Sequence, residues 1–546
     1  MPCRADYSPK PAVAKQLLRF AALDLQSVPR SRRIDPMTGS DASPALTDEL
    51  RPRAALRGDA LRRTLWLGTV AWVFGSVWLH AVAGTPTTNY AQALGASKFQ
   101  FGVLAALPFL ASLLSLPASL LIEATGRRKS IFLWGLYIQR FLWIPIALVP
   151  LWVVGTFGPQ ARGPAILLFL ALMFLMHGGQ TVGSPAWVSW MADIVPERLR
   201  GRYFARRRQW GIVSGVPTAL VVGLLLDFYV PGGDRLAMLK WCAGIFIVAA
   251  IFGALDIFCF GFVPDVPKAP QKGAHLMAAW REPLHNPQFL WFAAYVATLM
   301  FAFASMGQFV TLYILEQVGQ SSGRAGRGVN TITQLMLLVA PAVAQLLVLP
   351  VWGRAADRVG KRPLLKLAGY GLVPVGIGWC LVGPHSIWLG YVLAAAGAAL
   401  WVGIEIANFN LVLEMSGTDE NGTLRGGSSY VALNTVIISI AGGVGGLVWG
   451  AIAELLRDWT WVTPIKTLNF YDALFALSAL LRLVAVAVFL PRIHEPEAHR
   501  TREALRYMTA NIYNNVFNAL LQPLRMLGLR RESYPEADEF RRDRPA

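Results

Sequence analysis

The sequence predicts an all-α polytopic membrane protein, with twelve transmembrane helices arranged as two six-helix bundles. Its 546 residues are 55% hydrophobic and only 15% charged, whereas a soluble domain has roughly 25% charged residues. The apolar residues come in runs of about 20, the length at which a helix crosses a hydrocarbon core of roughly 30 Å. The two halves of the chain also repeat each other's loop motifs. These observations exclude a single water-soluble globule and a secreted domain behind a signal peptide.

Each apolar run is expected to be a helix, because a lone strand in lipid leaves its backbone groups without hydrogen-bond partners. The expected spans are about 64–84, 100–121, 131–154, 165–191, 209–230, 240–262, 290–315, 331–352, 364–383, 386–412, 429–455 and 470–491.

The net charge of +18 could suggest a nucleic-acid partner, but the distribution of the charge argues against one. Lys and Arg gather in both tails and in the loops that follow the even-numbered spans, and this is the pattern that orients membrane proteins. We therefore expect these loops and both termini to be cytoplasmic. The predicted location is the cell (inner) membrane, and the lipid bilayer is the expected surrounding.

The spans divide the chain into five parts. We expect a flexible cytoplasmic tail over 1–63, a first bundle over 64–262, a cytoplasmic linker over 263–289, a second bundle over 290–491 and a tail over 492–546. The last tail has apolar residues three and four apart over about 503–521, which predicts an amphipathic helix.

Four cysteines lie in 546 residues, and none forms a C-x-x-C pair. Three of them lie inside apolar runs, where a cysteine is usually a small packing residue. No disulfide framework, metal site or cofactor is expected.

Short loop motifs recur in the two halves. The chain reads Thr125-Gly126-Arg127-Arg128-Lys129 after the second span and Val359-Gly360-Lys361-Arg362-Pro363 after the eighth. A carboxylate, Glu123 or Asp357, stands three residues before each glycine. Leu199-Arg200-Gly201 and Leu424-Arg425-Gly426 repeat in the same way after the fourth and tenth spans. Two bundles in the same orientation are typical of many secondary transporters.

The segment Gly353 to Arg362 resembles the loop signature of the major facilitator superfamily, G-x-x-x-D-R-x-G-[RK]-[RK]. The first-half copy, Ser119 to Arg128, departs from it, because Ser119, Glu123 and Ala124 replace its Gly, Asp and Arg. The resemblance covers residues 64–491 and implies a transporter that moves a small solute by alternating access. It implies no enzyme activity and no cofactor, and we expect a monomer.

The resemblance implies that this signature forms a latch, which holds the cytoplasmic ends of the two bundles together in one state. The glycine lets helices approach closely, and the carboxylate can pair with the arginines. Simple orientation by positive charge is the alternative. The candidate gate residues are Glu123, Gly126, Arg127, Arg128, Arg200, Gly353, Asp357, Arg358, Gly360, Lys361 and Arg362.

Polar residues deep in the spans are candidates for the solute pathway, because an ionisable group there costs about 2.5–3.5 kcal/mol on the insertion scale. His177 and Gln180 share a helix face, and Trp401, Glu405 and Asn408 form one stripe. The full set is His177, Gln180, Gln308, Gln334, Glu405, Asn408, Asn434 and Arg140.

Each candidate also has a structural interpretation. Arg140 could contact an anion or form an internal ion pair, and Asp256 is expected to pair with the basic loops. Glu405 could couple transport to protons, or it could form a salt bridge with Arg200 or another basic loop residue. Trp72 and Trp187 could stack on a substrate ring, although packing is the simpler role.

Three functions follow from these observations. The leading one is a secondary active transporter for a small solute, with protons as the candidate coupling ion. A non-transporting sensor or assembly factor of the same fold is the alternative. A polytopic enzyme lacks any catalytic motif in this sequence.

Overall fold

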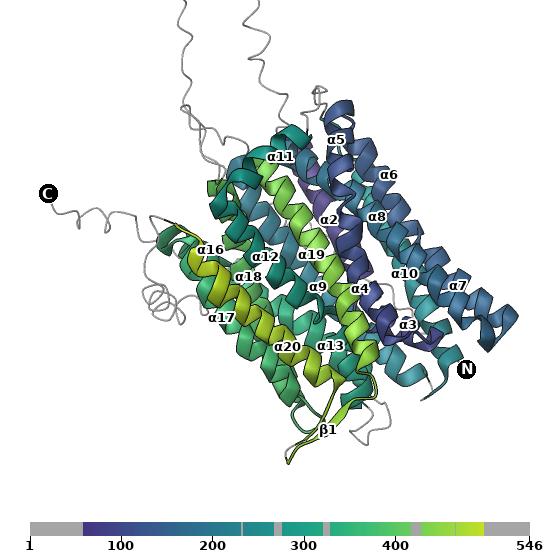
Figure 1. The fold of residues 1–546 in the computed structure, drawn as a ribbon. Coiled ribbons are helices and arrows are strands. Elements are labelled where there is room, and N and C mark those ends of the chain that lie inside the picture. Colours follow the sequence, from purple (N-terminus) through teal and green to yellow (C-terminus); the bar gives the residue numbers. More distant parts are fainter. Residues whose placement is uncertain are drawn as a thin grey trace, which may run out of the picture. The chain divides into compact units, whose positions relative to one another are not determined.

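Helical spans make up nearly all of the structure, which is a computed structural model. The structure describes residues 58–230, 233–266, 276–319, 328–415, 427–464 and 466–495. Within these residues, twelve helical spans are long and apolar enough to cross a membrane, which confirms the predicted number. The spans run alternately between two ends of the bundle (Figure 1). We call the end that contains the linker after residue 261 the linker end, and the opposite end, which contains a short β-hairpin, the hairpin end.

The first half contains six spans. Its elements are α2 (Gly58–Val82), α3 (Thr85–Leu94), α4 (Lys98–Ser112), α5 (Ser115–Thr125), α6 (Arg128–Phe141), α7 (Trp143–Phe157), the 3₁₀ turn η1 (Pro159–Ala161), α8 (Arg162–Ile194), α9 (Glu197–Tyr229) and α10 (Arg235–Gly261).

The second half also contains six spans, preceded by a linker helix. Its elements are α11 (Leu276–His285), α12 (Pro287–Ala304), α13 (Gly307–Tyr313), η2 (Ile314–Val318), α15 (Val329–Gln334), η3 (Leu335–Val339), α16 (Ala340–Val359), α17 (Lys361–Gly378), η4 (Trp379–Leu381), α18 (Ile387–Met415), α19 (Gly427–Leu455), β1 (Thr460–Val462), β2 (Thr467–Asn469), α20 (Phe470–Val484), η5 (Ala485–Phe489) and η6 (Leu490–Arg492).

Several spans are interrupted, and residues that break helices account for the clearest case. The first span stops at Val82 and resumes as α3, because Gly84 has a φ of 74° and Pro86 lies in the first turn of the new helix. A residue with a side chain rarely adopts that φ. Proline at the start of a helix removes no hydrogen bond. Single π-helical turns occur at η2, η3 and η5, a feature that is frequent at functional sites.

The fifth span differs most from its predicted bounds. The sequence predicts 209–230, whereas α9 begins at Glu197. Hydropathy marks only the part of a helix that suits lipid, and arginine is a good helix former. The arginines expected in a loop therefore lie on the first turns of a 33-residue helix.

Two short strands and the linker helix α11 are regular structure that the sequence did not predict. β1 pairs antiparallel with β2, with Thr460 opposite Asn469 and Val462 opposite Thr467. This hairpin lies outside the spans and joins α19 to α20. The predicted amphipathic helix at 503–521 and the N-terminal tail lie outside the described residues.

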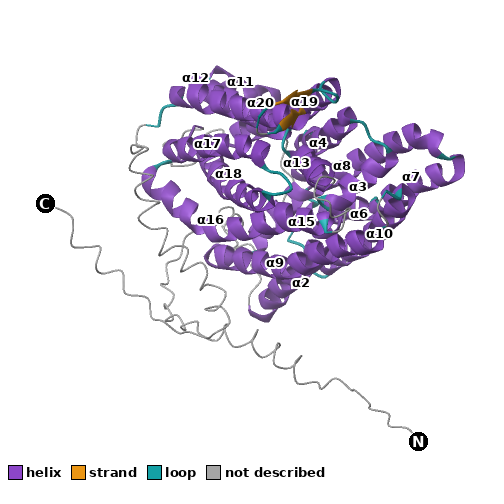
Figure 2. Ribbon diagram, turned by 90° about the horizontal axis from the view of Figure 1, so that it is seen from below, coloured by secondary structure: helices purple, strands orange, loops and turns teal. Residues whose placement is uncertain are grey.

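Glycines bring the two halves together along α4 and α19, which run side by side in two views (Figures 1 and 2). A Cβ added to Gly450 would lie 2.8 Å from the Cα of Gly102, and one added to Gly446 would lie 2.7 Å from the backbone nitrogen of Ala106. Such a contact requires small residues on both helices. The glycines of the eleventh span therefore permit close packing of α19 against α4.

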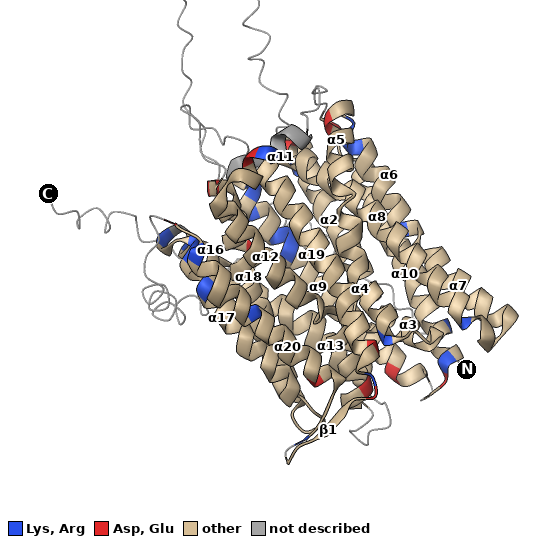
Figure 3. Cartoon of the chain, in the orientation of Figure 1, with Lys and Arg blue, Asp and Glu red and all other residues tan. Residues whose placement is uncertain are grey.

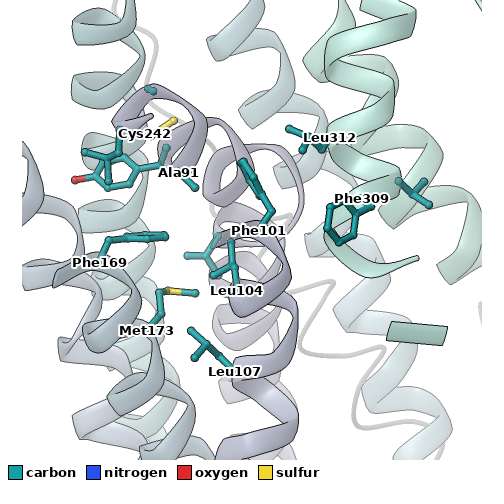
Figure 4. Close-up of a cluster of buried hydrophobic side chains, with 14 of the residues drawn as sticks. Ala91, Phe101, Leu104, Leu107, Phe169, Met173, Cys242, Phe309 and Leu312 are labelled. Carbon is teal, nitrogen blue, oxygen red and sulfur yellow. The ribbon is translucent and has the colours of Figure 1, made fainter. Parts of the chain in front are cut away.

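A buried apolar cluster extends across the same boundary. Figure 4 shows Phe101 and Leu104 of α4 next to Phe169 of α8, with Phe309 and Leu312 of α13 on the other side. All five side chains are buried. The halves therefore share a core near the hairpin end.

Charged side chains gather at the two ends of the bundle. Figure 3 shows Lys and Arg around α11 and α16 toward the linker end and acidic residues near α13 and β1 toward the hairpin end, with some residues of the opposite sign at each end. This is the distribution on which the predicted sidedness rests.

Candidate functional site

An ion pair joins the two halves at the hairpin end. The Nζ atom of Lys98, on α4, lies 2.7 Å from both carboxylate oxygens of Glu316, on η2. The hydroxyl of Tyr471, on α20, donates to the same carboxylate at 2.6 Å. Gln92 of α3 donates to it at 3.3 Å. Two residues of the first half thus bind one carboxylate of the second, and both charged side chains are about four-fifths shielded from solvent.

A second cross-half contact pairs a carboxylate with the start of a helix. Asp227, near the end of α9, accepts hydrogen bonds from the backbone nitrogens of Asn330 and Thr331 at 2.9 and 2.8 Å. It also accepts from the side chains of both residues at 3.0 and 2.6 Å. The first backbone N–H groups of a helix lack partners inside the helix and attract negative charge. Asp227 therefore caps α15 from the other half of the molecule.

Neutral polar contacts continue this boundary toward the middle of the membrane. Asn89 donates to Asn330 at 2.5 Å, and Thr88 donates to Gln308 at 3.1 Å. The amide of Gln334 donates to the Ala83 carbonyl at 3.4 Å, and its Oε1 atom is buried without a hydrogen-bond partner. The predicted pathway residues Gln308 and Gln334 are thus part of the boundary between the halves.

The contacts nearest the linker end are Ser112 with Ser439, at 2.5 Å, and Arg208 with Gln345, at 2.8 Å. Ser112 ends α4, roughly halfway along the second span. Arg208 lies roughly 16 Å from the start of α9, at 1.5 Å per residue. The cross-half hydrogen bonds of the described residues therefore concentrate between the hairpin end and the midplane.

Arg140 forms an internal ion pair. Its Nη2 atom lies 2.9 Å from Oδ2 of Asp256, and the two side chains are 6% and 5% exposed. The guanidinium also stacks on Trp78, with 3.4 Å between its carbon and the ring centroid. Of the two interpretations of Arg140, the structure favours the ion pair. The expectation that Asp256 binds the basic loops is wrong, because its partner is on α6.

Arg207, on α9, has a different environment. Its guanidinium carbon lies 4.4 Å from the ring centroid of Trp72 and 4.8 Å from that of Trp187. Its Nε atom donates to the Gly68 carbonyl at 3.2 Å. Among the residues that the structure describes, no carboxylate lies within 4 Å of this guanidinium. Residues of α2, α8 and α9 thus surround a cation that has aromatic neighbours and no direct ion pair among the described residues.

His177 and Gln180 lie on α8 beside α6. The side-chain Oε1 atom of Gln180 accepts from the Nε2 atom of Gln139 at 3.2 Å. Gln139 in turn accepts from Arg140 at 3.2 Å. His177 is half-buried one turn away. These candidates connect with the Arg140 pair rather than with the second half.

Glu405 lies in the linker-end half of α18 and is exposed. Its carboxylate accepts from the indole of Trp401 at 2.9 Å, and that indole stacks on Phe303 with 4.3 Å between ring centroids. The alternative partner, Arg200, donates instead to the Ala192 carbonyl at 2.9 Å. Within the described part of the chain, Glu405 therefore makes no ion pair.

Two amides of the second half have oxygens without partners. Asn408 on α18 and Asn434 on α19 each have a buried Oδ1 atom that no described group donates to. Both lie seven residues from the linker-end terminus of their helix. A buried acceptor without a partner costs free energy, so each is available to a bound donor.

The first signature loop is anchored by Arg128, which is 1% exposed. Its guanidinium lies 2.6 Å from Asp193 of α8 and donates to the Val266 carbonyl at 2.8 Å. Glu123 and Arg127 are exposed. The loop therefore binds the ends of the fourth and sixth spans, and Glu123 is not the partner of Arg128.

The second signature loop is anchored by a residue outside the motif. Glu495 accepts hydrogen bonds from the backbone nitrogens of Lys361 and Arg362 at 2.9 and 2.6 Å, and so caps α17. The side chain of Lys361 also pairs with Glu414. The side chain of Asp357 lies outside the described residues, and Arg358 is exposed.

The glycines of these loops have two different environments. Gly126 and Gly360 have φ values of 64° and 95°, so each supplies the turn between two spans that residues with side chains rarely adopt. A Cβ at Gly353 would meet nothing within 4 Å. The close helix approach expected at Gly353 is absent from this conformation.

A further polar junction lies at the hairpin end. Lys466, between β1 and β2, lies 2.7 Å from Asp472 at the start of α20 and 3.3 Å from the Tyr313 hydroxyl. Burial alone lowers the pKa of Lys466, but the hydrogen bond to Asp472 and the neighbouring negative groups raise it overall. Lys466 therefore stays charged beside the cross-half contacts.

Sequence reasoning missed Lys98, Glu316, Asp227 and Arg207. The first two are more than 200 residues apart and have no common motif. Asp227 lies near the end of a predicted span, and an intramembrane carboxylate is a signal that could have identified it. Arg207 was assigned to a basic loop.

Groups of three or more metal-binding side chains are absent from the described residues. The family model described as Major Facilitator Superfamily matches residues 65–426. The nucleoside transporter NupG has a similar structure, with a TM-score of 0.55 and 14% identity over 80% of this chain and 99% of that chain.

Two further solved structures are similar. A bacterial homologue of the iron transporter ferroportin, in an inward-facing state, gives a TM-score of 0.53 and 15% identity over 80% of this chain and 99% of that one. A D-xylose–proton symporter gives a TM-score of 0.51 and 15% identity over 77% of this chain and 96% of that one. No curated protein matches the chain in sequence.

Proposed function

Because the chain belongs to the Major Facilitator Superfamily, and is therefore a multi-pass membrane transporter, we propose that it moves a small solute by alternating access as a secondary active transporter. The linker end faces the cytoplasm in this proposal, as the basic loops favour. The protein sits in the cell's inner membrane and catalyses no chemical reaction.

The observation that supports alternating access is the distribution of contacts between the halves. Lys98 with Glu316, and Asp227 with the start of α15, close the hairpin end. These are ionic and polar contacts between two separate bundles, and water can replace them when the bundles separate. A permanent interface would instead bury charges at a net cost. The hairpin-end contacts therefore act as a gate that opens and closes.

Proton coupling through Glu405 is the second part of the proposal. The carboxylate is exposed, has no ion pair among the described residues and is oriented by the Trp401 indole. A carboxylate that no cation neutralises can gain and lose a proton as its surroundings change. In this proposal it is protonated while the solute crosses.

The test is solute flux into liposomes that contain the purified full chain. Pools of sugars, nucleosides, amino acids and organic acids are presented outside, and their uptake is measured by mass spectrometry. In a Gln92→Cys/Glu316→Cys variant, a bifunctional thiol reagent bridges the two halves at the gate. We expect uptake of at least one solute, inhibition after bridging and recovery after reduction.

The controls are protein-free liposomes and each single cysteine variant treated with the same reagent. If no pool enters, or if bridging leaves uptake unchanged, then the proposed transport through a moving hairpin-end gate is incorrect.

A further inference from the structure

Two arginines of the first half stack on tryptophans, and only one of them has a direct ion pair among the described residues. Arg140 lies on Trp78 and pairs with Asp256 at 2.9 Å. Arg207 lies between Trp72 and Trp187. Arg140 and Asp256 form a direct ion pair, whereas Arg207 forms none among the described residues and is attracted to Asp256 only from a greater distance. An unpaired charge inside a membrane span costs free energy, so the difference points to a ligand.

The donors of Arg207 are largely unused. A guanidinium has five N–H groups, and only Nε–H is occupied, by the Gly68 carbonyl. Among the described residues no hydrogen-bond acceptor is bound to Nη1 or Nη2. Both indole rings lie within 5 Å of the guanidinium carbon, so its remaining N–H groups are left for a ligand. Those groups form the fork that binds a carboxylate through two parallel hydrogen bonds.

The position of Arg207 suits a transported ligand. It lies roughly 15 Å from the start of α9, at 1.5 Å per residue. The next residue, Arg208, donates to Gln345 of the second half at 2.8 Å. Arg207, Trp72 and Trp187 are each only partly buried. Arg207 therefore lies one residue from a contact between the two halves, on the linker-end side of the closed gate.

We propose that Arg207, positioned by Trp72 and Trp187, binds the carboxylate of a small organic anion, which is the solute class of this protein. This inference rests on the proposed transport function. A doubly charged phosphate fits less well, because the neighbouring arginines that the structure describes already have partners: Arg140 pairs with Asp256, and Arg208 donates to Gln345.

Thermal unfolding of the full chain in detergent tests the site. The probes are sodium acetate, lactate, succinate, glutamate and benzoate, compared with sodium chloride and sodium phosphate at equal ionic strength. We expect at least one carboxylate to raise the unfolding temperature in a saturable manner. In Arg207→Gln the apparent affinity should fall about tenfold or more, because a hydrogen bond to a charged group contributes about 1.5–3 kcal/mol.

Two further variants make the test specific. Arg206→Gln changes an exposed neighbour and should bind like the parent protein. Arg207→Lys keeps the charge but loses the fork, and its affinity should be intermediate, which tests the site even if Arg207→Gln unfolds. Stabilisation by no carboxylate, equal stabilisation by chloride, or full binding by Arg207→Gln would each overturn the proposal.

Uptake into liposomes separates this inference from the transport function. If a neutral solute is transported and Arg207→Gln transports it normally, the anion site is wrong and the transporter proposal stands. If a carboxylate binds through Arg207 but is never transported, the site stands and the transport proposal is wrong.

Discussion

The Arg140–Asp256 ion pair allows a quantitative prediction, because both partners are buried within one half. Their side chains are 6% and 5% exposed, and the charged atoms are 2.9 Å apart. Removing one member of a buried pair leaves the other charge without compensation, which costs about 3–5 kcal/mol. We expect Asp256→Asn and Arg140→Met each to reduce the free energy of unfolding by this amount.

The surroundings of the pair leave little room for relaxation. A Cβ at Gly75 would lie 2.6 Å from Asp256, and one at Gly253 would lie 2.5 Å from Arg140. The helices that carry these glycines therefore press against the pair. An orphaned arginine has no nearby space in which to turn toward water.

The assay is unfolding of the purified chain in mixed detergent and dodecyl sulfate micelles, followed by circular dichroism. The double variant Arg140→Met/Asp256→Leu leaves no charge unpaired, so its loss should be smaller than the sum of the single losses by about 3 kcal/mol. The exposed pair of Arg62 and Asp59, 3.8 Å apart, is the control and should change stability by less than about 1 kcal/mol. Additive losses, or a loss below about 1 kcal/mol in both single variants, would refute the reasoning.

Three further predictions concern transport in liposomes. Asp357→Asn removes the charge of the second signature loop and should lower uptake several-fold with normal membrane insertion. The control Asp59→Asn, at an exposed site, should not lower uptake. Equal uptake by both variants would show that the loop serves only to orient the protein in the membrane. Glu405→Gln should abolish solute accumulation driven by a pH gradient but leave downhill solute exchange intact. Glu282→Gln, at an exposed site, is the control. Solute accumulation by the Glu405→Gln variant would exclude Glu405 as the coupling group. Gly450→Leu should nearly abolish uptake, because its side chain meets the backbone of α4 when the hairpin end closes, and normal uptake would show that this closure is dispensable.

The number of spans could be predicted because hydropathy measures the property that a bilayer selects. The start of α9 could not, since its arginine-rich first turns give no apolar signal. This error placed Arg207 in a loop and hid the cation between two tryptophans. The sequence alone identified Arg140 as a candidate residue, but only the structure shows that Asp256 is its partner.

The hairpin-end gate was equally hidden from the sequence. Lys98 and Glu316 come from different halves, and their pairing follows from the close approach that Gly102 and Gly450 permit between α4 and α19. The polar candidates Gln308 and Gln334 were found because they lie inside spans. Their roles at the boundary between the halves follow only from their partners.

Pulsed electron–electron distance measurement tests the alternation of the two ends most directly. One spin-label pair reports on the hairpin end, at Gln160 and Val462, and another on the linker end, at Ala124 and Arg281; all four positions are exposed. The native cysteines are replaced, and Asp227→Asn is introduced to weaken the hairpin-end gate without need of a solute. The account predicts that Asp227→Asn lengthens the hairpin-end distance and shortens the linker-end distance. Distances that both stay fixed, or that change in the same direction, would contradict alternating access.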